Sequence, residues 1–361
     1  MTGICFFIGD MTRSGGTERV TEQVSTLLCD EYRTHIVSLQ RQAFTFFYPL
    51  QEKVATYTIL KKPRKNIQRA VFAFPYIISV LARYIKRNQI DILIDVDSVL
   101  DVFSIPLKFF CKVKVISWTQ FAFHSKVGTG FRPLIEKISA KFSDATVVLT
   151  TKDYATVKAA GKRRGVLRCI PNMVFPVDRM PPAHLQQILS VGRLTYQKGF
   201  DYLIDVARLV LPKHPTWRWV IVGEGEERAA LTRKIKDNGL EDRVVLAGQQ
   251  KDVAAYYLNS AIYVLTSRFE GLGMVILEAL GQHVPVVSFD CEAGPSDMIA
   301  DGANGFLVPC FRVEEMANCI DELIESPKKR EAFSRASLMK LDAFMPQNVA
   351  KQWKALFEEV L

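Results

Sequence analysis

The sequence predicts an α/β protein of two doubly wound domains, each built around a parallel sheet. Its 361 residues suffice for about two domains. Short apolar runs of strand character recur along the chain, with helical stretches between several of them, and this alternation is typical of parallel sheets. Near the middle, the aperiodic segment Arg179–Pro182 contains two prolines and follows Ile170–Pro176, so we expect a domain boundary there.

The first strand is predicted at Gly3–Gly9, where most residues are apolar. Gly15 and Gly16 come next, and a helix is expected from Thr17, which can cap it. Two adjacent glycines let a backbone approach a ligand closely, but a tight turn without a ligand explains them equally well. Further strands of this half are expected at residues 34–39, 55–59, 90–95, 113–118 and 145–149.

In the second half, the apolar run Ala261–Leu265 predicts a buried strand. The glycines of Gly271-Leu272-Gly273 break the pattern, and Met274–Leu280 has the composition of a helix. In open α/β sheets, ligands bind at the carboxyl ends of such strands. We therefore expect the backbone N–H groups of residues 271–273, at the start of a helix, to bind a phosphate or diphosphate.

Two carboxylates accompany this turn. Glu270 is expected in the strand-to-helix turn, and Glu278 about two turns inside the helix. Negative charges beside a phosphate-binding site are unfavourable unless the ligand also presents hydroxyl groups to them. A nucleotide sugar does so, with sugar hydroxyls for Glu270 and ribose hydroxyls for Glu278. The alternative is two ordinary solvated glutamates, because spacing alone does not separate the two interpretations.

Two cations follow the strand predicted at Gln187–Val191. Arg193 and Lys198 lie five residues apart across a loop, so both can converge on one diphosphate, Arg193 through its forked guanidinium and Lys198 as a point charge. Such a pair would neutralise a leaving group without a metal; two solvated surface cations are the alternative. Gly223 and Gly225 end a later apolar run, and we expect them at positions of close approach to a nucleotide.

Composition argues against several classes of protein. Seven cysteines are scattered without a Cys-x-x-Cys pair, which argues against a zinc site or a disulfide framework and for a reducing compartment. The N-terminus lacks the features of a signal peptide. The longest apolar run, Ala70–Ala82, is too short to span a bilayer. We therefore expect a cytoplasmic protein, with peripheral contact at the inner face of the membrane compatible with this composition.

Charge is distributed unevenly along the chain. Residues 1–180 carry 27 basic and 14 acidic side chains, whereas residues 181–361 carry 20 and 24. The basic half predicts an anionic partner, such as anionic lipid or a phosphate-bearing acceptor, with simple solubility as the alternative. The segment Lys61–Arg87 suits an anionic membrane surface, or it is an ordinary core helix with charged flanks. The half lacks nucleic-acid recognition modules, so we expect no nucleic-acid partner.

Several motifs resemble those of glycosyltransferase family 4, the retaining glycosyltransferases with the GT-B fold. The resemblance covers nearly the whole chain, is specific in the second half, and is looser from about residue 40 to 110. Turns in the last third, including Gly294-Pro295, resemble transferases of lipopolysaccharide core or other surface polysaccharides. The matching motifs are Gly15-Gly16-Thr17-Glu18, Ile170-Pro171-Asn172, Gly192-Arg193-Leu194 with Lys198-Gly199, and Glu270 with Glu278.

The resemblance implies a domain organisation and a reaction. Residues 1–176 would form the acceptor-side Rossmann-like domain and 177–344 the nucleotide-sugar domain, while the helix within 345–361 would cross back onto the first domain. The reaction would move a hexosyl unit from a nucleotide sugar, with a UDP-sugar preferred, to a lipopolysaccharide, O-antigen or lipid-linked glycan. No further cofactor and no metal are implied.

The resemblance also assigns roles to residues. Arg193 and Lys198 would stabilise the leaving diphosphate, Glu270 would orient the sugar, and Glu278 would hold the ribose. The loop of Gly15 and Gly16 would shape the cleft that faces these groups.

The expected catalytic histidine is replaced. Relatives commonly place a His two residues after a Trp, facing the donor sugar, but Gln120 occupies that position after Trp118. His124 lies four residues farther along and could substitute if the loop folds back. Gln120 can hydrogen-bond a sugar hydroxyl but cannot carry a positive charge. Both residues stay candidates.

The pair Asp95-Val96-Asp97 allows a metal-dependent alternative. An Asp-x-Asp pair holds a divalent cation on the diphosphate in the GT-A glycosyltransferases. Here the pair ends a predicted strand, where Asp97 or Ser98 can simply cap the next helix. Because the second half already offers cations for the diphosphate, we expect no metal site.

Two other functions stay open. One is a sugar-nucleotide epimerase on a similar two-domain frame. The other is a non-catalytic nucleotide-sugar-binding protein, an alternative that the departure at Gln120 keeps open.

Overall fold

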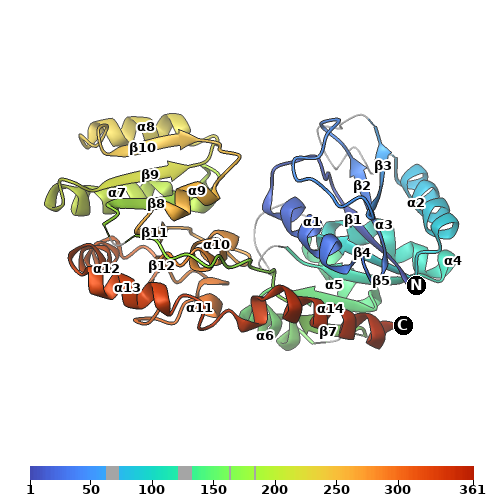
Figure 1. Cartoon of the computed structure of the whole chain (residues 1–361). Helices are drawn as coiled ribbons and strands as arrows, with labels where there is room; N and C mark the ends of the chain where they lie inside the picture. The colour runs from blue at the N-terminus through green and yellow to red at the C-terminus, as the bar shows by residue number, and fades with distance from the viewer. Residues whose placement is uncertain (62–72, 121–131, 162–163, 183) are drawn as a thin grey trace. The chain divides into compact units, whose positions relative to one another are not determined.

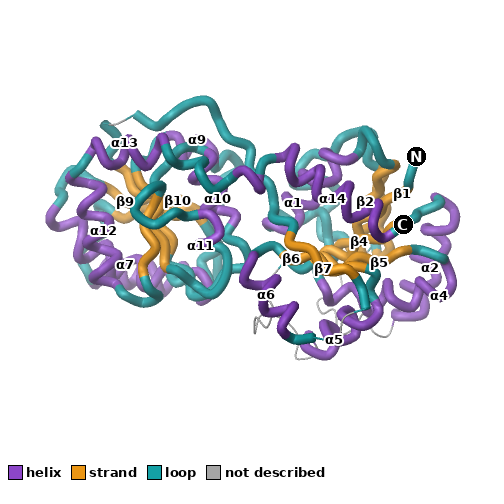
Figure 2. Tube along the Cα trace, turned by 90° about the horizontal axis from the view of Figure 1, so that it is seen from below, coloured by secondary structure: helices purple, strands orange, loops and turns teal. Residues whose placement is uncertain are grey.

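The computed structural model describes residues 1–61, 73–120, 132–161, 164–182 and 184–361 (Figure 1). The chain divides into two compact units. Unit 1 comprises Met1–Met173 together with Pro346–Leu361, and unit 2 comprises Val174–Met345. Each unit has a parallel sheet with helices on both faces (Figure 2), as the sequence predicted.

The sheet of unit 1 has the order β3-β2-β1-β4-β5-β6-β7 in the described residues, and every pairing is parallel. β1 and β4 are buried along their whole length, which explains why their sequences are almost continuously apolar instead of alternating. The half-buried edge strand β7 was not predicted. The strands are β1 (Gly3–Ile8), β2 (Arg33–Gln40), β3 (Ala55–Leu60), β4 (Ile92–Val96), β5 (Lys114–Trp118), β6 (Ala145–Val148) and β7 (Val166–Cys169).

The helices of unit 1 follow these strands. On α2, the buried residues Ile77, Leu81 and Ile85 pack into the core formed with β1, β2 and β4. The described part of the expected membrane-surface segment is therefore a core helix with charged flanks, and residues 62–72 lie outside the described residues. The helices are α1 (Gly16–Leu28), α2 (Phe74–Asn88), α3 (Asp101–Ser104), α4 (Lys108–Cys111), α5 (Arg132–Phe142), α6 (Thr151–Ala159) and α14 (Pro346–Val360).

The last helix of the chain, α14, belongs to unit 1. Trp353 is fully buried, with its ring centroid 5.0 Å from that of Trp118 at the end of β5. Phe357 meets the ring of Tyr32 at 5.2 Å. The expected return of the C-terminal helix to the first domain is confirmed, and the apolar face of the helix is what holds it there.

The sheet of unit 2 has the order β10-β9-β8-β11-β12-β13, again parallel throughout the described residues. Its core lies between these strands and α7, α8 and α12. The strands are β8 (Gln187–Val191), β9 (Arg218–Val222), β10 (Val244–Gly248), β11 (Ile262–Leu265), β12 (Val286–Phe289) and β13 (Gly305–Val308). The helices are α7 (Phe200–Val210), α8 (Arg228–Asp237), α9 (Ala254–Leu258), α10 (Met274–Gly281), α11 (Pro295–Met298), α12 (Val313–Glu325) and α13 (Pro327–Arg335).

Both sheets reverse their strand order at their first strand. β1 lies between β2 and β4, and β8 lies between β9 and β11. At such a switch point the loops that leave the two neighbouring strands diverge, and ligands bind in the crevice at the carboxyl ends. In unit 2, β8 and β11 are neighbouring strands, so the loops that follow them start next to each other at the carboxyl edge of the sheet.

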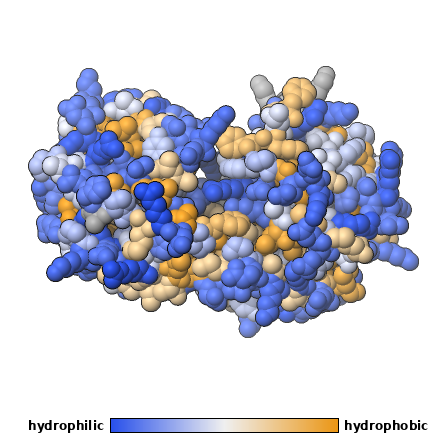
Figure 3. All heavy atoms as spheres, viewed as in Figure 1, coloured by the Kyte–Doolittle hydropathy of each residue, from blue (hydrophilic) through white to orange (hydrophobic). Residues whose placement is uncertain are grey.

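No helix among the described residues is long and apolar enough to cross a membrane. The face shown in Figure 3 carries mainly hydrophilic residues, with apolar ones interspersed over both units.

Candidate active site

The candidate site is built from the two loops at the switch point of unit 2. Lys198 ends the short 3₁₀ helix η4 (Tyr196–Lys198) after β8, and Glu270 lies in the loop between β11 and α10. The ammonium of Lys198 is 2.7 Å from Oε1 of Glu270, and both side chains are mostly buried. The buried hydroxyl of Ser267 donates to the same oxygen at 2.6 Å. These two contacts fix the orientation of the Glu270 side chain, and Glu270 lies in the strand-to-helix turn, as predicted.

Arg268 joins the two loops. Its guanidinium donates to the carbonyl of Tyr196 at 2.7 Å and to both carboxylate oxygens of Asp201 on α7, at 2.9 and 2.6 Å. The same group lies 4.0 Å from the ring centroid of Tyr196 and 4.6 Å from that of Tyr202. Although partial burial favours the neutral acid, the hydrogen bonds and charge of Arg268 hold the pKa of Asp201 below its usual value. This pair fixes the turn that carries Lys198.

Backbone contacts support the same loops. The backbone N–H of Arg268 donates to the carbonyl of Gln197 at 2.8 Å, and the side-chain amide of Gln197 donates to the carbonyl of Phe269 at 3.1 Å. Gly199 has φ +61°, and a Cβ atom there would overlap the carbonyl of Thr266. Only glycine allows this close approach of the two loops.

Gly223 and Gly225 have a packing role that the sequence did not reveal. Gly223 has φ +146°, and a Cβ atom there would overlap the carbonyl oxygen of Gly192; at Gly225 it would overlap that of Leu194. The close approach predicted for these glycines is therefore an approach to the chain's own β8 loop. They hold the backbone beside Arg193, while their contact with a nucleotide stays a prediction.

The start of α10 offers unpaired backbone donors. Its N-cap is Gly273, with φ +85° and no capping side chain. The carbonyl of Gly273 accepts from the backbone N–H of Ile276 at 2.8 Å, so the donors left for a ligand are those of the first two residues of the helix. Gly271 and the buried Leu272 precede it. This geometry fits the predicted phosphate-binding site.

Glu278 is the fifth residue of α10, a little over one turn inside the helix, instead of the two turns expected. The hydroxyl of Tyr257 donates to its Oε2 at 3.0 Å. The fully buried Tyr263 lies near both acids: burial first, and then the charge of Glu270, raises its pKa well above the usual value. Tyr263 therefore stays neutral behind the two carboxylates.

Arg193 lies in the β8 loop with Lys198 but has an exposed side chain. Among the described residues, its side chain forms no hydrogen bond or ion pair with Lys198, Glu270 or Glu278, and Lys198 pairs with Glu270 instead. Of the predicted site residues Arg193, Lys198, Glu270 and Glu278, all of them described, the structure joins Lys198 and Glu270 in an ion pair. Convergence of Arg193 and Lys198 on one diphosphate stays a prediction.

In unit 1, Gly15 is the N-cap and Gly16 the first residue of α1, the helix that follows β1 at the switch point of that sheet. The carboxylate of Glu18 folds over Gly15 so closely that a Cβ atom would overlap it. Gln120 follows β5 and is 9% exposed, and no described residue accepts from its amide nitrogen. An unsatisfied buried amide at a strand end suits a polar ligand. His124 lies outside the described residues.

The Asp-x-Asp pair does not form a surface metal site in the described structure. Asp97 accepts from the backbone N–H of Val99 at 3.3 Å and so caps a 3₁₀ turn, as the capping alternative predicted. Asp95 is fully buried and accepts from Ser104 at 2.6 Å. The carboxyl group of Asp95 faces the buried Asp101. Because Asp95 is directed into the core and Asp97 caps a turn, the pair Asp95 and Asp97 cannot jointly chelate an ion at the surface.

Comparison with known proteins gives the family. The family model described as glycosyl transferases group 1 matches residues 181–338. An uncharacterized glycosyltransferase of Haemophilus influenzae is 30% identical over 99% of this chain and 100% of its own length. The amylovoran biosynthesis glycosyltransferase AmsD of Erwinia amylovora is also 30% identical, over 98% of this chain and 99% of its own. The chain belongs to the group 1 glycosyl transferases.

The fold of this glycosyltransferase is GT-B, as predicted. The crystal structure of Anabaena Alr3699/HepE in complex with UDP superposes with a TM-score of 0.82 at 18% identity, covering 99% of this chain and 100% of that one. The family model covers the segment that contains Arg193, Lys198, Glu270 and Glu278. It leaves residues 1–180 unmatched.

Sequence reasoning missed the residues that position the site of this glycosyltransferase. Ser267 and Arg268 precede Glu270 by three and two positions, but nothing in their spacing shows which atoms they contact. Tyr257 and Asp201 are separated from their partners by 21 and 67 residues. An expectation that buried carboxylates need donors could have directed attention to Ser267 and Tyr257.

Proposed function

We propose that this glycosyltransferase moves a hexosyl unit from a nucleotide sugar, preferably a UDP-sugar, to a hydroxyl of a lipopolysaccharide, O-antigen or lipid-linked glycan. The proposal includes retention of configuration and independence of metal ions. The names of the similar proteins support the substrate classes: AmsD acts in amylovoran biosynthesis, and Alr3699/HepE was crystallised with UDP.

The observation that carries the proposal is the ion pair of Lys198 and Glu270 at the switch point of unit 2. It sets a cation and a fixed carboxylate beside the uncapped start of α10. A nucleoside diphosphate needs the cation and the helix amides, whereas a sugar needs a hydrogen-bond acceptor for its hydroxyls. One ligand class, an activated sugar, uses all of these groups together.

In the proposed reaction, the bond between C1 of the sugar and the diphosphate oxygen breaks while the acceptor oxygen bonds to C1 on the same face. The acceptor proton passes to a leaving phosphate oxygen. Lys198, Arg193 and the first amides of α10 stabilise the charge that develops on the diphosphate. Glu270 orients the sugar hydroxyls, and Glu278 holds the ribose.

A screen of nucleotide sugars by thermal shift identifies the donor, and incubation of that donor with membranes from a strain lacking the gene identifies the acceptor. We expect nucleoside diphosphate and a new glycoside of unchanged anomeric configuration, at the same rate with and without chelator. An isomerised sugar nucleotide would instead indicate an epimerase, and binding without turnover would indicate a binding protein.

A further inference from the structure

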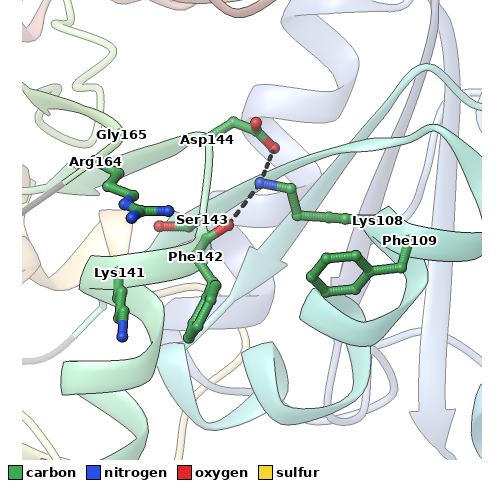
Figure 4. Close-up of a pocket in the computed structure, with 8 residues that line it drawn as sticks. All are labelled: Lys108, Phe109, Lys141, Phe142, Ser143, Asp144, Arg164 and Gly165. Atoms are coloured by element: carbon green, nitrogen blue, oxygen red, sulfur yellow. Dashed lines mark hydrogen bonds and ion pairs between the residues drawn. The ribbon is translucent and has the colours of Figure 1, made fainter.

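A cavity of about 320 Å³ lies at the edge of the first sheet where β5, β6 and β7 begin (Figure 4). Its lining comes from three segments that each directly precede one of these parallel strands: α4, the end of α5 and residues 164–165. It therefore lies at the edge opposite the carboxyl ends where Gly15 and Gln120 are found. A ligand bound here leaves the loops at the carboxyl ends uncovered.

The cavity is electropositive. Lys108 is neutralised by Asp144 at 2.9 Å and also donates to the carbonyl of Phe142 at 2.6 Å (Figure 4). Lys141 and Arg164 also line it, and no described acidic residue forms an ion pair with either. Because Asp144 is already committed to Lys108 and to the backbone N–H of Val115, two cations stay uncompensated. An anion is the complementary ligand.

Exposed apolar side chains lie on the two helices that line the cavity, α4 and α5. Phe109 and Phe110 of α4 are 74% and 68% exposed. Leu134, Ile138 and Phe142 are 57%, 37% and 36% exposed, and their spacing of four residues aligns them along one face of α5. Rings and aliphatic groups in water are unfavourable unless something covers them. We call these five residues, with Lys141 and Arg164, the α4–α5 surface.

We propose that the α4–α5 surface docks on an anionic lipid bilayer, with a lipid phosphate in the cavity against Lys141 and Arg164. Phe109, Phe110 and the apolar face of α5 enter the interfacial region of the bilayer. The argument is charge complementarity: uncompensated cations interleaved with exposed apolar groups match a surface of phosphates above acyl chains. The proposal does not depend on the transfer reaction, because it concerns the opposite edge of the sheet from the predicted ligand loops.

The test is flotation of the full chain with vesicles of phosphatidylcholine alone or mixed with phosphatidylglycerol. We expect binding to the mixed vesicles only, with a loss at high salt. Phe109→Ser/Phe110→Ser and Lys141→Glu/Arg164→Glu should each lower the partition coefficient at least about tenfold. The controls are Phe44→Ser, an exposed phenylalanine elsewhere in unit 1, and Lys236→Glu/Lys251→Glu on unit 2. They should stay within about twofold of the wild type.

Circular dichroism and donor thermal shifts verify that each variant is folded and still binds its donor. Equal flotation of the surface variants and the wild type would overturn the proposal. So would equal binding of the wild type to neutral and anionic vesicles. Self-association of the wild type that the phenylalanine variant abolishes, without vesicle binding, would assign the surface to a second copy of the chain and also overturn it.

Discussion

The two units share an architecture but treat their buried polar groups differently. At the switch point of unit 2, Lys198, Ser267 and Glu270 satisfy one another. In unit 1, Oδ2 of Asp10 after β1 and the amide nitrogen of Gln120 after β5 are buried without a hydrogen-bond partner among the described residues. Of the described residues of unit 2, only Gln282 has such an atom. Unit 2 is thus organised before a ligand arrives, whereas unit 1 leaves polar atoms for a ligand or water to satisfy.

The largest expected effect follows from breaking the organised pair. Lys198→Met should lower kcat about 10²- to 10³-fold, because the leaving diphosphate loses its cation. It should also lower stability, since Glu270 keeps Ser267 but loses the opposite charge while mostly buried. Turnover of the identified donor and thermal unfolding measure the two effects.

Lys213→Met is the matched control, because Lys213 also forms an ion pair within unit 2, at 2.6 Å to Asp321 of α12, but away from the β8 and β11 loops. It should leave turnover unchanged. A Lys198→Met enzyme with near-normal kcat would show that the ion pair of Lys198 and Glu270 only stabilises the fold. The organised groups of unit 2 would then have no demonstrated role in catalysis.

A smaller effect is expected at the clamp that supports the pair. Arg268→Lys keeps the charge but loses the forked contact with Asp201, so the turn bearing Lys198 should shift and kcat should fall about tenfold or more. Asp201→Asn should act in the same way, and the double variant should be little worse than either single one. Additive losses in this cycle, measured by steady-state kinetics, would show that the two residues act independently.

The sequence was sufficient to predict the strands and the two parallel sheets, but it did not predict which loop residues contact one another. Buried parallel strands such as β1 are nearly all apolar, so their places and the two doubly wound sheets were predicted. Glu270 and Lys198 were found because glycines and charges cluster at predicted strand ends. Their mutual ion pair was not foreseen, because a separation of 72 positions in the sequence gives no information on the distance in space.

The departures have similar physical causes. The start of α10 at Met274 was predicted, but Glu278 is only the fifth residue of the helix, which is a little over one turn of 3.6 residues instead of the two turns expected. The edge strand β7 is short and half exposed, so it lacks the apolar run that identified the other strands. The membrane-surface interpretation of Lys61–Arg87 depended on the basic residues around its apolar run. In the structure, α2 has basic residues in its last turn, but its apolar face is buried in the core of unit 1.

Two buried aspartates of unit 1, Asp95 and Asp101, should make the stability of the protein depend on pH. Burial raises the pKa of Asp95 well above its usual value and that of Asp101 to about 6, so the pair retains a proton that the unfolded chain releases near 3.8. The folded state then binds more protons, and stability falls as pH rises from about 4 to about 7, by up to about 1.4 kcal/mol per pH unit per proton.

Asp95→Asn should flatten this dependence, because an amide mimics the protonated acid and can still accept from Ser104 and donate to Asp101. Denaturant unfolding at several pH values measures it. Asp205→Asn, a half-exposed carboxylate of unit 2, is the control and should leave the slope unchanged. A steep slope that survives in the Asp95→Asn variant would assign the pH dependence to other groups.

The smallest expected effect concerns the unsatisfied amide itself. Gln120→Leu removes a buried amide nitrogen that lacks an acceptor among the described residues, so the free energy of unfolding should change by less than about 1 kcal/mol or rise. If Gln120 serves the substrate, the same variant should lose turnover several-fold, because a ligand oxygen loses its donor. Gln282→Leu removes a buried amide oxygen of unit 2 that lacks a donor among the described residues, and it should gain stability without losing turnover. Destabilisation by Gln120→Leu with unchanged kcat/KM would mean that its amide is satisfied inside the protein, and the contrast between a prearranged unit 2 and a ligand-dependent unit 1 would not hold.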